Sequence, residues 1–142
     1  MIVLPPPEPI GRVLELTRTI AVVGLSPKKQ RPSNRVARYL VAAGLTVIPV
    51  NPGQDRILGM ACYPSLARIP GSVDLVDIFR ASDRVLPVVQ EAIDIGARAV
   101  WMQEGIVNEE AADLAHRHGL QVIMDRCLMT DYQAWLAATR KQ

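Results

Sequence analysis

The chain has 142 residues, a hydrophobic content of 49% and a formal net charge of +2. This length predicts one domain with a substantial core, and so small a net charge gives no general argument for nucleic-acid or membrane binding. The 11 prolines and 9 glycines lie between apolar runs rather than in one tract, which argues against disorder.

The amino end and the cysteines point to a reducing compartment. The chain starts MIVLPPPEPIGRVLEL, which lacks the basic and apolar regions of a signal peptide, and Pro5–Pro7 would interrupt a signal helix. No apolar run reaches the length of a membrane span. Cys62 and Cys127 form no C-x-x-C pair, and His116 and His118 have too few neighbouring ligands for zinc. We therefore expect a cytoplasmic protein without a metal, membrane or nucleic-acid partner.

Five short apolar runs predict five strands: Thr19–Val23, Thr46–Val50, Asp74–Phe79, Arg98–Met102 and Gln121–Met124. Each run is nearly continuous rather than alternating, which is typical of strands buried on both faces of a parallel sheet. Helical patterns separate most of them, and a glycine follows each pattern: Ser33–Ala43, Arg84–Ile95 and Asn108–His118.

Other segments depart from this rhythm. Residues 51–73, between the second and third strands, carry no long helical pattern, and only Pro64–Ile69 predicts a short helix there. Two flanking helices are expected at the ends of the chain, over Glu8–Thr17 and Asp131–Arg140.

The alternation of strands and helices predicts an α/β fold. We expect a Rossmann-like, doubly wound sheet of five parallel strands in the order 3-2-1-4-5, with flanking helices. Its ligand crevice would lie beyond the carboxyl ends of the first and fourth strands, where the winding would reverse. Residues 1–142 would form a single domain, with a helical extension over residues 1–18 and a carboxyl-terminal helix over residues 128–142.

The loop after the first strand has the composition of a phosphate-binding loop. Gly24 permits a tight turn and a close approach of a ligand, but the further glycines of a G-x-G-x-x-G fingerprint are absent. No acidic residue lies between Ser26 and Arg38, whereas basic residues are frequent: Lys28, Lys29, Arg31, Arg35 and Arg38. Ser33 and the amides of the following helix would face an anion. The alternative is an ordinary turn with solvated lysines.

Asn51 and Pro52 follow the second strand, where a chain that binds NAD usually has an acidic residue at the strand end. Asn51 suits either a ribose or adenine contact or a turn before the proline. Arg80 follows the third strand and suits a forked phosphate contact, stacking on a base, or a structural ion pair. Ser82 or Asp83 would then cap the next helix.

The last two strand ends offer binding groups but no catalytic set. Gln103 would hydrogen-bond a ligand, and Gly105 would allow its close approach. Cys127 would need a nearby base to act as a nucleophile, whereas His116 and His118 would lie at the opposite pole of the sheet. The carboxylates that open the last inter-strand helix, Glu109 and Glu110, complement its dipole. The chain therefore predicts a binding protein rather than an enzyme.

Six segments carry a resemblance to a known family: VGLSPKKQRPSNRVARYL, VIPVNP, GMACYPSL, VDLVDIFR, AIDIGARAVWMQEGIVNEEAA and VIMDRC. The chain resembles the stand-alone CoA-binding domain family, which is similar in fold to the amino-terminal domain of the succinyl-CoA synthetase α-subunit. The resemblance implies that the nucleotide end of CoA crosses the carboxyl edge of the sheet. The binding residues it implies are Gly24, Leu25, Ser26, Arg31, Ser33, Asn34, Val50, Asn51, Pro52, Phe79, Arg80, Gln103 and Gly105. Lys28 and Lys29 are added on grounds of charge.

The function that follows is non-catalytic binding of CoA or an acyl-CoA, as a carrier, a sensor or the partner of an acyl-transfer enzyme. The synthetase uses a phosphorylated histidine in a second domain, which this chain does not reach, so ligase activity is not implied. Two alternatives remain open. One is an NADP-dependent oxidoreductase, because a basic loop also suits a 2′-phosphate, and the other is an interaction protein with an unused nucleotide pocket.

Overall fold

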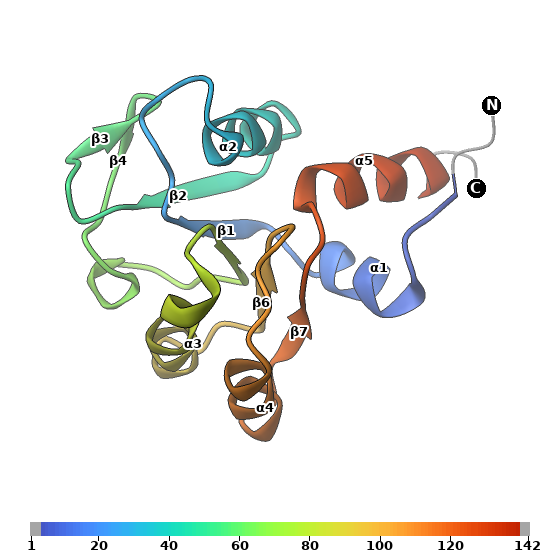
Figure 1. Cartoon of the computed structure of the whole chain (residues 1–142). Helices are drawn as coiled ribbons and strands as arrows, with labels where there is room; N and C mark the ends of the chain where they lie inside the picture. The colour runs from blue at the N-terminus through green and yellow to red at the C-terminus, as the bar shows by residue number, and fades with distance from the viewer. Residues whose placement is uncertain (1–3, 140–142) are drawn as a thin grey trace.

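The computed structural model describes residues 4–139, which form a parallel sheet between two layers of helices (Figure 1). The five strands are β1 (Thr19–Val23), β2 (Thr46–Val50), β5 (Leu75–Ile78), β6 (Ala99–Met102) and β7 (Gln121–Ile123). Each adjacent pair is parallel. The predicted α/β class and the five strands are therefore confirmed, with strand ends that differ by about one residue.

The predicted strand order is wrong in one respect. The observed order is β2-β1-β5-β6-β7, so the third strand of the chain lies beside β1 and not beyond β2. Asp74, just before β5, holds this position, because its Oδ2 accepts hydrogen bonds from the N–H groups of Arg18 (2.9 Å) and Thr19 (3.0 Å). In consequence the winding reverses between the first and third strands, β1 and β5, and the expected crevice moves there.

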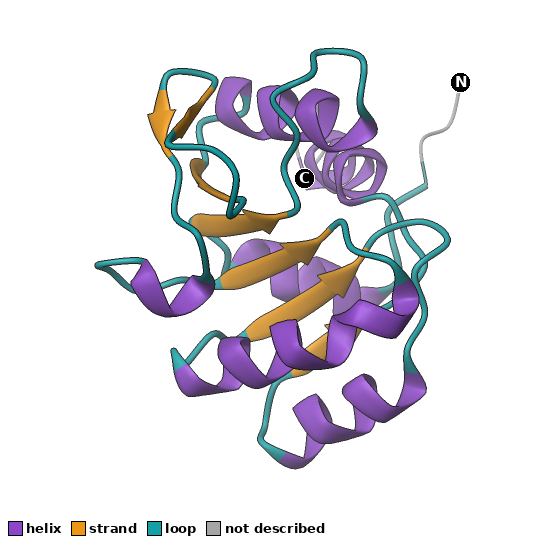
Figure 2. Cartoon of the chain, turned by 60° about the vertical axis from the view of Figure 1, so that its left-hand side comes forward, coloured by secondary structure: helices purple, strands orange, loops and turns teal. Residues whose placement is uncertain are grey.

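Helices cover both faces of the sheet (Figure 2). On one face pack α1 (Glu8–Glu15), α2 (Pro32–Ala42) and α5 (Leu128–Thr139), and on the other α3 (Val85–Asp94) and α4 (Glu109–Arg117). All five were predicted, although α5 begins before the expected Asp131. The expected end of that helix, Arg140, lies outside the described residues.

The segment between β2 and β5 carries small elements instead of a long helix. A two-stranded antiparallel hairpin, β3 (Arg56–Ile57) and β4 (Met60–Ala61), is followed by a short 3-10 helix, η1 (Leu66–Arg68). This length of chain lets the connection pass from the edge strand β2 across to the far side of β1. Among residues 4–139, no helix is long and apolar enough to cross a membrane.

One charged residue lies inside the core. Asp77 of β5 pairs in register with Val22 and Trp101, is fully buried, and has no hydrogen-bond partner for either carboxylate oxygen. Burial therefore raises the pKa of Asp77 well above its usual range.

Candidate functional site

Gly24 brings the ends of β1 and β5 together at the point where the winding reverses. Its φ is +85°, and a Cβ built on it would lie 2.3 Å from the carbonyl oxygen of Phe79. The N–H of Gly24 also donates to the carbonyl of Val50 at 2.9 Å. The turn thus requires glycine for both its backbone angle and its close approach to β5.

The loop between Gly24 and α2 is held by its own side chains. Ser33 Oγ accepts a hydrogen bond from the N–H of Ser26 (3.0 Å), and Asn34 Nδ2 donates to the carbonyl of Ser26 (2.9 Å). Both side chains are buried. Arg38 donates to Asn34 Oδ1 (2.9 Å) and to the carbonyl of Lys29 (3.0 Å). Ser33, Asn34 and Arg38 therefore fix the shape of the loop.

The remaining basic side chains of the loop point to solvent. Lys28, Lys29, Arg31 and Arg35 are exposed, and none of them has an ion-pair partner within residues 4–139. The first turn of α2 receives no side-chain cap. An open pocket of about 350 Å³, which we call the phosphate pocket, lies here and is lined by Gly24, Ser26, Lys28, Arg31, Pro32, Ser33 and Phe79. Exposed cations without an ion-pair partner and an uncapped helix amino terminus are a favourable setting for phosphate.

Asn51 braces this loop from the side of β2. Its Nδ2 donates to the carbonyl of Leu25 (2.9 Å), and its Oδ1 accepts from the N–H of Gly53 (2.9 Å). The second bond forms an Asx turn, as expected if Asn51 is a turn residue before Pro52. The side chains of Leu25 and Val50 belong to the core, so their part in the site falls to their backbone carbonyls, whereas Pro52 is exposed.

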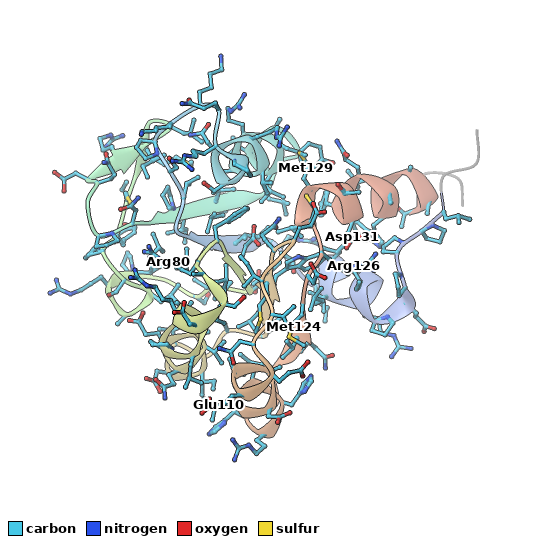
Figure 3. The ribbon with its side chains drawn as sticks, viewed as in Figure 1. Arg80, Glu110, Met124, Arg126, Met129 and Asp131 are labelled. Atoms are coloured by element: carbon cyan, nitrogen blue, oxygen red, sulfur yellow. The ribbon has the colours of Figure 1, made fainter. Side chains whose placement is uncertain are left out.

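Phe79 and Arg80 follow β5 on the far side of the phosphate pocket. The half-buried ring of Phe79 forms part of the pocket wall, and Arg80 extends from the same strand end (Figure 3). Within the described part of the chain Arg80 has no ion pair, so the structure provides no support for its structural alternative. The expected cap is wrong, because Ser82 instead accepts from the N–H of Val107 at 3.1 Å and α3 has no side-chain cap.

Gln103 and Gly105 do not meet the phosphate pocket. Gln103 is 5% exposed, and its Oε1 accepts a hydrogen bond from the N–H of Leu128 at 3.1 Å, at the start of α5. Gly105 is exposed with φ +81°, and its N–H donates to Asp125 Oδ1 at 2.7 Å. In this structure Gln103 stabilises the start of a helix, and Gly105 forms a turn.

A second pocket lies at the carboxyl ends of β6 and β7. This distal pocket has a volume of about 240 Å³ and is lined by Glu104, Asp125, Arg126, Cys127, Thr130 and Asp131. Arg126 donates through Nε (2.7 Å) and Nη2 (2.9 Å) to the two carboxylate oxygens of the buried Asp131. The hydrogen bond to Asp131 raises the pKa of Arg126, as a forked ion pair should.

The structure places neither histidine beside Cys127. Cys127 is half-buried at the start of α5, whereas His116 and His118 lie at the carboxyl end of α4, near the opposite edge of the sheet. Burial raises the pKa of the Cys62 thiol, which disfavours its reactive thiolate form. Among residues 4–139, no three His, Cys, Asp or Glu side chains gather as a metal site.

Comparison with known proteins identifies the family. The profile described as a CoA binding domain matches residues 18–133 of this chain. The chain belongs to the CoA binding domain family. YneT of Bacillus subtilis (strain 168), described as an uncharacterized protein, is 40% identical over 119 residues, which cover 84% of this chain and 88% of YneT.

Solved structures and longer enzymes also resemble this CoA-binding domain. A hypothetical protein from Pyrococcus horikoshii OT3 superposes with a TM-score of 0.88 and 39% identity, and the match covers 91% of each chain. Acetate–CoA ligase (ADP-forming) I of Archaeoglobus fulgidus is 30% identical over 121 residues. That match covers 78% of this chain but only 18% of the ligase, so the likeness concerns one part of that enzyme.

The predicted site residues fall into two groups. The loop and Phe79 line the phosphate pocket, and Asn51 at the end of β2 holds the loop through Leu25. Gln103 and Gly105 lie toward the distal pocket. Sequence reasoning missed five lining residues of the distal pocket: Glu104, Asp125, Arg126, Thr130 and Asp131. For Glu104, Asp125 and Arg126 the available signal was their position just after β6 and β7, because a ligand crevice lies at strand carboxyl ends. Thr130 and Asp131 lie in α5 and gave no such signal.

Proposed function

We propose that this domain binds CoA or an acyl-CoA along the carboxyl edge of its sheet and catalyses no reaction on it. The observation that carries the proposal is the phosphate pocket. Exposed basic side chains and the uncapped amino terminus of α2 lie there beside a turn that requires glycine at position 24. Membership of the CoA binding domain family supports the same ligand.

The charge of the loop suits CoA better than it suits a single diphosphate. CoA carries a diphosphate and a separate 3′-phosphate. Of the five basic residues between Ser26 and Arg38, only Arg38 is tied to the loop itself, by hydrogen bonds to Asn34 and Lys29. The other basic side chains remain available, and exposed cations contribute to phosphate binding without a fixed partner in the free protein.

The absence of catalysis is supported by the strand ends themselves. Cys127 is the one nucleophilic thiol in the distal pocket, and the imidazoles of His116 and His118 lie on the far end of α4. Nucleophilic catalysis by a thiol requires a base within hydrogen-bond reach. A carrier or sensor of CoA, or a partner of an acyl-transfer enzyme, requires only the binding.

Isothermal titration with CoA and with dephospho-CoA tests the proposal. We expect CoA to bind more tightly, because dephospho-CoA lacks the 3′-phosphate that the loop would neutralise. Arg31→Ala should weaken CoA binding by tenfold or more, the usual scale of one charge-assisted phosphate contact. Arg117→Ala, at the carboxyl end of α4, is the matched control and should bind as the wild type does. If neither nucleotide binds the wild-type protein, the proposal is wrong.

A further inference from the structure

The carboxyl edge of the sheet ends in a pocket that the nucleotide of CoA does not need. The distal pocket lies at β6 and β7, whereas the phosphate pocket lies at β1 and β5. Figure 3 shows Arg80, which follows the central strand β5, well apart from the Arg126–Asp131 pair, which follows the edge strand β7. Both pockets are open to solvent on the same edge, so one extended ligand can reach both.

The pantetheine arm is long enough to reach from one pocket to the other. Three strand spacings separate β1 from β7 in the observed order, which amounts to about 14 Å. The arm from the diphosphate to the sulfur has as many main-chain bonds as four amino-acid residues, which extend over about 14 Å. With its phosphates at α2, CoA would place its thiol in the distal pocket.

The two pockets carry opposite charge. Lys28 and Arg31 line the phosphate pocket. In the distal pocket Asp131 neutralises Arg126 through both of its oxygens, which leaves Glu104 and Asp125. Neither of these two carboxylates has an ion-pair partner in the described chain, although Asp125 Oδ1 accepts a hydrogen bond from the N–H of Gly105.

We infer that the distal pocket receives the thiol end of CoA and selects uncharged acyl groups over acyl groups that end in a carboxylate. This inference rests on the proposed function. The charge of CoA is confined to its nucleotide end, so the polarity of the edge also favours one direction of binding. A terminal carboxylate would face Glu104 and Asp125 and would find the one cation of the pocket already paired with Asp131.

The repulsion is of measurable size. Two like charges a few ångströms apart in a partly enclosed pocket repel enough to weaken binding about tenfold, and salt screens this effect. Size and charge are separable, because butyryl-CoA and succinyl-CoA carry acyl chains of equal carbon number and only succinyl-CoA ends in a carboxylate.

The experiment is isothermal titration of the full chain with CoA, acetyl-CoA, butyryl-CoA and succinyl-CoA at low and high salt. We expect succinyl-CoA to bind about tenfold more weakly than butyryl-CoA, and the difference to shrink at high salt. The Glu104→Gln/Asp125→Asn double variant should remove most of the difference. Asparagine retains an oxygen for the N–H of Gly105 and tolerates the φ of +58° at residue 125.

Glu110→Gln is the control, because Glu110 lies on α4, away from Arg126 and Asp131 (Figure 3), and its loss should leave the difference unchanged. Equal binding of butyryl-CoA and succinyl-CoA by the wild type would overturn the inference while leaving CoA binding intact. Tighter binding of succinyl-CoA would overturn it as well, since Arg126 would then pair with the ligand. If no CoA species binds, the proposed function itself fails.

Discussion

Replacing Gly24 by alanine should damage the site more than any other glycine-to-alanine change in the sheet connections. The positive φ of +85° costs a residue with a Cβ about 1–2 kcal/mol. The added Cβ would also lie 2.3 Å from the carbonyl oxygen of Phe79, about 1 Å closer than an ordinary contact between carbon and oxygen. Backbone must therefore move, since no flexible side chain is available to yield.

That movement has an identifiable cost. The ends of β1 and β5 are joined by the hydrogen bond from the N–H of Phe79 to the carbonyl of Val23 (2.8 Å), and Gly24 donates to Val50 (2.9 Å). Weakening these two bonds costs about 0.5–1.5 kcal/mol each. With the cost of the positive φ, Gly24→Ala should lower the free energy of unfolding by about 2–5 kcal/mol and weaken CoA binding, because the phosphate pocket is displaced.

Gly44→Ala is the matched control. Gly44 has φ +92° and no atom within 4 Å of an added Cβ, so it bears the conformational cost without the clash. Alanine also reduces the entropy of the unfolded chain, which leaves a net loss of about 1 kcal/mol or less. Urea unfolding of both variants measures the difference. If Gly24→Ala is no less stable than Gly44→Ala, the close approach of β1 to β5 does not exist in solution and the reasoning is refuted.

Three further changes test other parts of the structure. Asp77→Asn should remove a pH dependence of stability. Because burial raises the pKa of Asp77, the unfolding free energy of the wild type falls by about 1.4 kcal/mol per pH unit from about pH 4 upward, until the folded-state pKa is passed. Equal slopes of unfolding free energy against pH for the variant and the wild type would contradict this. Gln103→Leu should lower the free energy of unfolding by about 1–3 kcal/mol, because the N–H of Leu128 loses its acceptor, whereas Gln103→Glu keeps an oxygen there. Equal urea midpoints for the two variants would count against this role of Gln103 at the start of α5. Leu58→Asn should stabilise the chain by about 1 kcal/mol. Leu58 is 42% exposed with φ +54° in the β3–β4 turn, and asparagine tolerates that angle better than leucine does. An unchanged or lower melting temperature would show that no strain is relieved.

The class of fold was predictable because the strands can be recognised from short apolar runs and the helix ends from glycines, both of which are local sequence patterns. The strand order was not, because it depends on which side of β1 the third strand joins. One signal was present in the second strand. Pro49 has no N–H to donate, so it suits an edge strand, and β2 is an edge strand in the observed order and would have been an inner one in the expected order.

The phosphate pocket was predictable in position but not in the roles of its polar side chains. Sequence reasoning took Ser33, Asn34 and Asn51 as ligand contacts. In the folded chain all three are used, at least in part, to hold the loop through hydrogen bonds to backbone groups. A polar side chain close to a turn satisfies backbone groups that burial would otherwise leave unpaired, and residue type does not distinguish this from ligand binding.

The roles of Gln103 and Asp77 were beyond reach for a different reason. Both depend on contacts between segments far apart in the sequence. Gln103 meets the start of α5, and Asp77 faces a core formed by helices at both ends of the chain. Their neighbours could not be inferred from the local pattern, so neither the hydrogen bond of Gln103 to Leu128 nor the burial of Asp77 was predicted.

The central claim is that this chain binds CoA through its phosphate pocket. A native mass spectrum of the purified protein with added CoA, beside that of Lys28→Ala/Arg31→Ala, tests it most directly. We predict one CoA bound per wild-type chain and a marked loss of the complex in the variant, because Lys28 and Arg31 line the pocket. Absence of a complex with the wild-type protein, or equal complexes with both proteins, would contradict the account.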